Sequence, residues 1–295
     1  MKNIKHLKKD KFNFIQKVLF TFFQKYFDDR RFAIWSLKRW IGDSCIDNPK
    51  TFNEKLQWLK LNKREDFYKS FVDKLVVKSK VEQILGRQYI TETLKIWDKV
   101  DDIKLEDIPK PCILKTNHGS GSNIIIKEST NIDLKILKKN LNSMINKDYY
   151  KLGREWVYKD IEPKIFCEEL LIDNEGKIPK DFKIFCFNGT AKYIQIDLDR
   201  FSNHQRVFYD TNWIKQEFNI LYPLSSQSVN RPDTLEEMLG LAEKMSKGLY
   251  FARVDFYSLP EVKFGELTFF PGNATEPFTS KEWDLKLGNL IDLNN

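Results

Sequence analysis

The second half of the chain constrains the fold most, because its apolar runs are short and are separated by turn residues. Residues 165–172, 182–188, 192–197, 251–257 and 262–270 all have strand length, and Asn188-Gly189 is a typical hairpin turn. A helical pattern over residues 235–248 interrupts them. Since helices and strands do not alternate regularly, the sequence predicts an α+β fold rather than a doubly wound α/β fold.

The first half combines helices with a smaller group of strands. Thr51 and Glu54 have capping-box spacing and predict a helix through Leu61. Further helices are expected at 66–85 and 131–147, and strands at 112–116 and 124–127. We predict four parts: a basic amphipathic helical extension (1–47), an N-terminal lobe (48–110), a glycine-loop subdomain (111–164) and a C-terminal lobe (165–295).

The basic charge is concentrated at the N-terminus. Residues 1–40 hold eleven Lys or Arg and three Asp, a net charge of +8, while the other 255 residues hold 38 and 39, a net charge of −1. A nucleic-acid enzyme would carry its basic surface on the catalytic body, so we expect no nucleic-acid partner. The four cysteines lack metal-ligand or CxxC spacing, which indicates reduced thiols and a cytoplasmic protein.

Residues 11–27 place aromatic and aliphatic side chains at helical spacing, on one face. They contain no apolar stretch long enough to cross a bilayer. Such a helix either docks on the body of the protein or lies on an anionic membrane surface through residues 1–40. The face comprises Phe12, Ile15, Leu19, Phe22, Phe23 and Tyr26.

A lysine followed by a glycine-containing turn forms the first candidate site. Lys115 ends a predicted strand, and the turn that follows contains His118, Gly119, Ser120, Gly121 and Ser122. Glycines let backbone N–H groups approach a phosphate closely, and lysine supplies a mobile charge. No Walker spacing is present, so this is not a P-loop. His118 and His204 are candidate acid–base or substrate groups, and His118 in the glycine turn is the stronger acid–base candidate.

Two neighbouring strands carry the second candidate site. Arg253 and Asp255 share one strand face, as do Glu266 and Thr268 on the next strand. Two carboxylates together with phosphate oxygens make a typical Mg²⁺ site.

The third candidate site is an acidic, otherwise apolar strand. Its backbone suits an adenine, and a nearby acid suits ribose hydroxyl groups. The residues are Glu168, Glu169, Leu170 and Leu171, followed by Asp181 and Lys183.

The order of the three sites resembles the ATP-grasp superfamily. The last strand of that superfamily commonly reads Glu-x-Asn-x-x-Pro-Gly, and here it reads Glu266-Leu-Thr-Phe-Phe-Pro-Gly272. Thr268 stands where asparagine is usual. Blocks at 52–60, 73–78, 114–121, 181–189 and 265–271 look like the TupA-like ATP-grasp family over about residues 48–290. That family is named for teichuronopeptide synthesis and is associated with bacterial surface polysaccharides.

The resemblance implies an ATP-grasp fold whose two lobes grip ATP and Mg²⁺. It implies that Lys78 and Lys115 bind the phosphates under the loop at 118–122, and that residues 168–171 form the adenine hinge. Asp181 or Lys183 would lie near the ribose or phosphates. Asp255 and Glu266 would hold Mg²⁺, with Thr268 as a third candidate, and Arg253 would face the transferred phosphoryl group.

The reaction expected from the resemblance is amide ligation through an acyl phosphate. Its substrates would be an amino acid or peptide and an acidic, uronic-acid-containing glycan precursor, with His204 and Arg206 as candidate substrate residues. The protein would be cytoplasmic, at the inner face of a bacterial membrane. The alternatives are a sugar or small-molecule kinase, a glycosyltransferase using Asp197-Leu-Asp199, and a scaffold with a vestigial nucleotide site.

Overall fold

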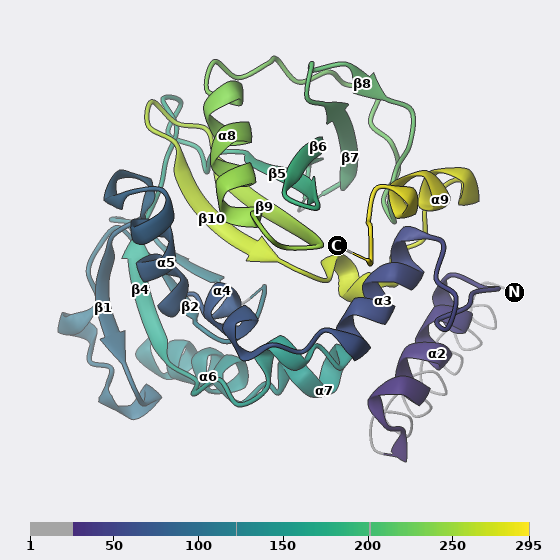
Figure 1. Ribbon diagram of the computed structural model, residues 1–295. Coiled ribbons are helices and arrows are strands. Elements are labelled where there is room, and N and C mark those ends of the chain that lie inside the picture. Colours follow the sequence, from purple (N-terminus) through teal and green to yellow (C-terminus); the bar gives the residue numbers. More distant parts are fainter. Residues whose placement is uncertain (1–25, 122, 201, 295) are drawn as a thin grey trace, which may run out of the picture.

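Two antiparallel sheets and their covering helices make up the computed structural model, which describes residues 26–121, 123–200 and 202–294 (Figure 1). The smaller sheet has the strand order β1-β4-β2-β3, and the larger sheet has the order β10-β9-β5-β6-β7-β8. The strands are β1 (Thr93–Trp97), β2 (Cys112–Thr116), β3 (Asn123–Ile126), β4 (Ile165–Glu169), β5 (Asp181–Phe187), β6 (Thr190–Leu198), β7 (Gln205–Asp210), β8 (Lys215–Gln216), β9 (Phe251–Tyr257) and β10 (Lys263–Thr268).

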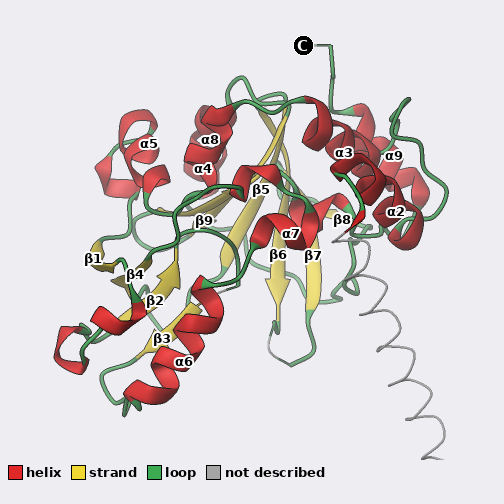
Figure 2. Cartoon of the chain, turned by 90° about the horizontal axis from the view of Figure 1, so that it is seen from below, coloured by secondary structure: helices red, strands yellow, loops and turns green. Residues whose placement is uncertain are grey.

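Each sheet has its own apolar core. Helix α8 (Leu235–Ser246) packs its buried face on the larger sheet, and α6 (Leu134–Ile145) covers the smaller sheet through Leu137 and Leu141 (Figure 2). The other helices are α2 (Asp29–Trp40), α3 (Phe52–Asn62), α4 (Lys69–Val72), α5 (Val76–Ile84), α7 (Tyr149–Gly153) and α9 (Lys281–Asn289). The antiparallel pairing confirms the predicted α+β class.

The predicted helix over 66–85 is wrong, because the chain breaks it into α4 and α5 at Asp73. The Asp73 carboxylate accepts hydrogen bonds from the backbone N–H groups of Leu75 (2.9 Å) and Val76 (3.2 Å). Asp73 itself is extended. A side chain that binds nearby backbone N–H groups in this way favours a new helix start over continuation. The capping box of Thr51 and Glu54 is present as predicted.

Helix α3 carries a buried polar stripe, formed by Asn53, Gln57 and Lys60 at four- and three-residue spacing. Gln57 donates to the carbonyl of Asn273 (2.9 Å), and Lys60 donates to the Asn273 side chain (2.8 Å) and the Gly153 carbonyl (3.0 Å). Asn53 donates to the Glu276 carbonyl (3.1 Å). The stripe therefore fixes the segment that follows β10.

Of the predicted amphipathic face, residues 12–23 lie outside the described part of the chain, and Tyr26 is exposed. Helix α2, which follows it, docks on the body by burying Phe32, Ala33 and Leu37. Its Asp29 pairs with Arg64 (2.7 Å) and accepts a hydrogen bond from the Tyr150 hydroxyl (2.7 Å). In the part of the chain that the structure describes, every helix is too short or too polar to span a bilayer. Membrane contact through residues 1–40 stays a prediction.

Candidate active site

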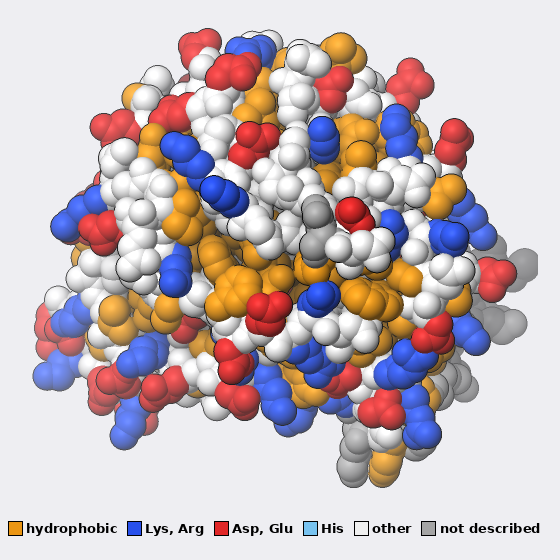
Figure 3. All heavy atoms as spheres, viewed as in Figure 1, with side chains coloured by type: hydrophobic (Ala, Val, Ile, Leu, Met, Phe, Trp, Pro, Cys, Tyr) orange, Lys and Arg blue, Asp and Glu red, His pale blue; other side chains and the backbone are white. Residues whose placement is uncertain are grey.

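A cavity of about 1350 Å³ lies between the two sheets. The smaller sheet contributes Ile113, Lys115 and Glu168 to its wall, and the larger sheet contributes Asp197 and Tyr257. Figure 3 shows apolar side chains gathered across the middle of the face seen in Figure 1, with charged side chains around them. The cavity exceeds the roughly 300–1,000 Å³ of an ordinary ligand pocket, so it has room for a nucleotide and a second substrate.

Two lysines share one carboxylate on the smaller sheet. Glu168 Oε1 lies 2.6 Å from Lys78 Nζ on α5, and Glu168 Oε2 lies 2.5 Å from Lys115 Nζ on β2. Burial opposes ionisation of Glu168, but the two ammonium groups outweigh it and lower its pKa. Burial also lowers the pKa of Lys78, although Glu168 offsets part of this effect. Glu168 therefore holds the ammonium groups of both lysines beside the cavity.

The glycine turn after β2 is held by a third lysine. Lys74 donates from Nζ to the Gly119 carbonyl, and Tyr149 donates its hydroxyl to the Ser120 carbonyl (2.7 Å). A Cβ at Gly119, where φ is +149°, would lie 2.2 Å from the Tyr149 ring. The position therefore requires glycine. Gly121 lines the cavity, and Ser122 lies outside the described residues.

The second candidate site assembles around one guanidinium. Arg253 donates to both oxygens of Asp255 (2.8 Å each), to Glu266 Oε1 (3.0 Å) and to the Thr268 hydroxyl (3.2 Å). A bulge at Gly265 places Glu266 opposite Asp255 in the β9–β10 register. Burial opposes ionisation of Glu266, but Arg253 and Lys74 outweigh it and lower its pKa. Tyr257 and Gly265, beside these residues, line the cavity.

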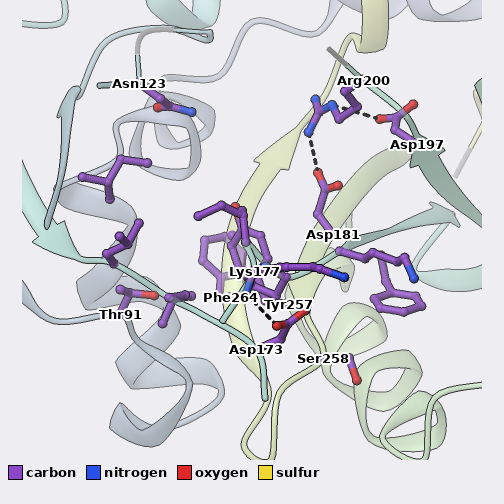
Figure 4. A pocket seen from close by; sticks show the side chains of 18 of the residues that line it. Thr91, Asn123, Asp173, Lys177, Asp181, Asp197, Arg200, Tyr257, Ser258 and Phe264 are labelled. Atoms are coloured by element: carbon purple, nitrogen blue, oxygen red, sulfur yellow. Dashed lines mark hydrogen bonds and ion pairs between the residues drawn. The ribbon is translucent and has the colours of Figure 1, made fainter. Parts of the chain in front are cut away.

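A row of ion pairs continues from this cluster across the larger sheet. Lys183 Nζ binds Asp255 (3.0 Å) and also contacts Asp181. Arg200 then bridges Asp181 (3.4 Å) and Asp197 (3.9 Å), as Figure 4 shows. Burial lowers the pKa of Lys183. The row connects the Arg253 cluster to the far end of the cavity.

His204 and Arg206 meet at Asp197, at that far end. His204 Nε2 lies 3.0 Å from Asp197 Oδ1, and Arg206 Nε donates to the same oxygen (2.9 Å). Arg206 also binds the Ile220 carbonyl (2.8 Å) and Glu276 (2.8 Å) and is buried. Because protein groups already satisfy Arg206, it positions Asp197, and Arg200 is the arginine that lines the cavity.

The donor set at Asp255 and Glu266 fits Mg²⁺. Both carboxylates converge on one cationic centre, the Arg253 guanidinium, and Glu266 keeps an oxygen, Oε2, outside that contact. Mg²⁺ is commonly held by one or two carboxylates plus substrate phosphates. Within the described residues no group of three or more His, Cys, Asp or Glu side chains could hold a metal by itself, so the phosphates would complete the coordination. Thr268 Oγ1 accepts from Arg253, and its ligation of metal stays a prediction.

The described lining of the cavity includes part of the predicted set: Lys78, Lys115, Gly121, Glu168, Glu169, Leu170, Leu171, Asp181 and His204. Lys183, Arg253 and Asp255 connect to it through the ion-pair row. His118 is not among the lining residues; its ring packs edge-on to Tyr149, and Nε2 lies 3.2 Å from the Lys147 carbonyl. A catalytic role for His118 therefore has no geometric support in the described cavity.

Sequence reasoning missed Lys74, Arg200 and Tyr257, all of which line the cavity. Lys74 stands four residues before Lys78, a spacing that brings two lysines to one side of a helical segment. That spacing could have identified it. Arg200 has no local signal, since its partners come from two strands.

Comparison with known proteins identifies the family of the chain. The family model described as TupA-like ATPgrasp matches residues 54–292. No curated protein matches the chain. The solved structures that resemble it include D-alanine–D-alanine ligase from Bacillus anthracis complexed with ATP, at 14% identity, with 68% of this chain and 54% of that chain covered and a TM-score of 0.38.

Two further solved structures have comparable scores. N5-carboxyaminoimidazole synthase from Aspergillus clavatus is 10% identical, and the match covers 68% of this chain and 45% of the synthase chain, with a TM-score of 0.43. The ATP-grasp ligase PsnB complexed with minimal precursor has 10% identity, coverage of 69% and 53%, and a TM-score of 0.36. The chain spans about half the length of these structures. Because the TM-scores are below 0.5, the family match carries the assignment.

Proposed function

Because this chain belongs to the TupA-like ATP-grasp family and has its α+β fold, we propose that it is an ATP-dependent carboxylate–amine ligase. The reaction transfers the terminal phosphoryl group of ATP to a carboxylate, and an amine then displaces phosphate from the acyl phosphate. Positioning and charge neutralisation provide most of the catalysis in phosphoryl transfer. The cavity supplies both without needing a covalent nucleophile.

The observation that carries the proposal is the placement of cations on two sides of one cavity, with Lys78 and Lys115 beside the smaller sheet and Arg200 beside the larger one. Lys78 on α5 and Lys115 on β2 neutralise phosphate oxygens, and the loop at 118–122 covers them. Residues 168–171 hold the adenine with their backbone, and Asp181 or Lys183 lies near the ribose or phosphates. Arg253, on the other sheet, faces the transferred group.

Asp255 and Glu266 would hold Mg²⁺ together with ATP oxygens. The ion withdraws charge from the phosphates, which makes the phosphoryl group easier to transfer. The protein's own contribution is orientation: Arg253 and Lys183 fix the Asp255 carboxylate, and the bulge at Gly265 brings Glu266 opposite it.

The proposed substrates are an amino acid or short peptide and a uronic-acid-containing precursor of a surface polysaccharide. The family's association with such polymers supports the glycan. The basic charge of residues 1–40 suits a lipid-linked substrate at the cytoplasmic face of a bacterial membrane.

The first experiment measures Mg²⁺-dependent ATP binding and turnover with uronates and amino acids as paired substrates. Lys115→Ala and Glu266→Gln should each lower turnover by about 10²–10³-fold, the usual effect of losing one electrostatic contact to the transition state. Lys139→Ala and Glu261→Gln, at exposed positions, are the matched controls. If ATP neither binds nor turns over, the ligase proposal fails.

A kinase of the same fold is the second candidate. It would leave a stable phosphoester and release no phosphate, whereas the ligase releases one phosphate for each amide formed. Product analysis by mass spectrometry separates the two.

A further inference from the structure

His204 stands at the start of β7 with one ring nitrogen already engaged. Its Nε2 lies 3.0 Å from Asp197 Oδ1. Burial opposes ionisation of Asp197, but Arg206, Lys183 and the His204 hydrogen bond outweigh it and lower its pKa to about 2. An ionised carboxylate only accepts hydrogen bonds, so Nε2 must carry the proton. The neutral imidazole then keeps its lone pair on Nδ1.

The ring is held in one orientation. Tyr222 packs against it with the ring centroids 3.7 Å apart and the ring planes tilted by 31°, and the Arg206 guanidinium lies 4.8 Å from the Tyr222 ring centre. Arg206 is itself anchored by Asp197 and Glu276. Rotation of the imidazole would break both the ring contact and the hydrogen bond.

The free nitrogen belongs to a cavity-lining side chain. Within the described residues His204 Nδ1 has no hydrogen-bond partner. His204 lines the cavity together with Asp199 and Arg200. Asp199 forms no ion pair in the described part of the chain, so its carboxylate can attract a protonated amine. An imidazole that is held in one orientation and has an unbound ring nitrogen beside a cavity can act as a general base.

We propose that His204 is the general base of the amine half-reaction, and that Asp197 and Arg206 are its positioning residues. This inference rests on the proposed ligase function and names the second substrate as a primary amine, bound at the Asp199–Arg200–His204 end of the cavity. His204 Nδ1 takes one proton from the bound ammonium group, which frees the nitrogen lone pair. That lone pair forms the C–N bond at the acyl carbon, and the C–O bond to phosphate breaks with its electron pair. The second proton leaves the nitrogen with the departing phosphate.

The amine half-reaction is tested by replacing the amine with hydroxylamine, which is largely unprotonated at neutral pH and therefore needs no base. The panel uronate that supports turnover serves as the carboxylate. In His204→Gln, amide formation should fall by about 10²-fold or more while hydroxamate formation and ATP affinity stay near wild type. Ser202→Ala, an exposed change in the same loop, is the control. An equal loss with both nucleophiles, or no loss, would overturn the proposal.

A second measurement does not depend on turnover. The chain has three histidines, so long-range ¹H–¹⁵N correlation spectra can assign His204 by its absence in His204→Gln. The expected neutral tautomer has the proton on Nε2, and Asp197→Asn should remove that preference. A proton on Nδ1 in the native chain would refute the base assignment even if ligation is observed. Failure of ligation with the expected tautomer would reject the proposed function and, with it, the role of His204 in that reaction.

Discussion

Arg253 lies two residues before Asp255 on the same strand and donates from Nε and Nη2 to its two carboxylate oxygens. Both hydrogen bonds measure 2.8 Å. This fork aligns the guanidinium plane with the carboxylate, a geometry that lysine cannot reproduce. Arg253 also reaches Glu266, so it organises both proposed metal-binding carboxylates.

Arg253→Lys should therefore impair chemistry more than binding. Lysine keeps the positive charge but loses the paired hydrogen bonds, so we expect kcat to fall by about 10²–10³-fold with a smaller change in ATP affinity. Steady-state turnover and calorimetric ATP binding measure the two effects. Arg231→Lys, at an exposed surface pair with Glu236, should leave both unchanged. Wild-type kcat in Arg253→Lys would contradict the assigned role.

Glu168→Gln should destabilise the nucleotide-free protein and make its stability more sensitive to ATP. The change leaves the ammonium groups of Lys78 and Lys115 close together without their shared counter-ion. Breaking a buried ion pair on one side costs roughly 3–5 kcal/mol of unfolding free energy. ATP phosphates would replace the lost charge, so urea unfolding with ATP should recover part of the loss. Glu128→Gln, at an exposed position outside the cavity, is the control; equal effects at both positions would exclude the shared-carboxylate model.

The two loop glycines should respond differently to alanine. Both have positive φ, but a Cβ at Gly119 would collide with the Tyr149 ring, whereas a Cβ at Gly121 meets nothing within 4 Å. Gly121→Ala should cost about 1 kcal/mol of backbone strain. Gly119→Ala should cost more and should weaken ATP binding, because Tyr149 also holds the Ser120 carbonyl. Thermal unfolding and ATP titration of both variants test this, and a more harmful Gly121→Ala would argue against it.

Asp197 should make the protein less stable in acid. Its folded pKa of about 2 is below the ordinary value of 3.8, so its contribution to stability is present above about pH 4 and is lost as pH falls toward 2. The shift corresponds to roughly 2 kcal/mol. The unfolding free energy of Asp197→Asn should therefore fall less between pH 5 and pH 2 than that of the wild type. Parallel curves for the two proteins would show that Asp197 is not the titrating group.

Local patterns predicted much of the fold. Strand β9 occupies the predicted residues, and the Asn188-Gly189 hairpin is present, because alternation and turn chemistry are set by neighbouring residues. Strand β7 and helix α9 were not predicted, since their burial depends on distant packing. The Asp73 break escaped detection because residues on both sides favour a helix.

The residue types of the candidate site can be read from the sequence, but the ion pairs between them cannot. Residue types indicated Lys115, Arg253, Asp255 and Glu266, but no local signal joins Glu168 to Lys78 or Arg200 to Asp181. Those pairs arise from the sheet register and from the approach of α5. Sequence patterns also do not reveal the ion pairs of Arg206 with Asp197 and with Glu276, which is 70 residues away.

The polar stripe of α3 also bears on the order in which the chain folds. Gln57 binds a carbonyl 216 residues further along the chain, and Lys55 donates to the Ile291 carbonyl, 236 residues away. During synthesis α3 emerges early, yet the buried side-chain amides of Asn53 and Gln57 have no partners until the region after β10 has been made. Because contacts this distant in sequence form slowly, we expect closure of α3 onto this region to be a late step in folding.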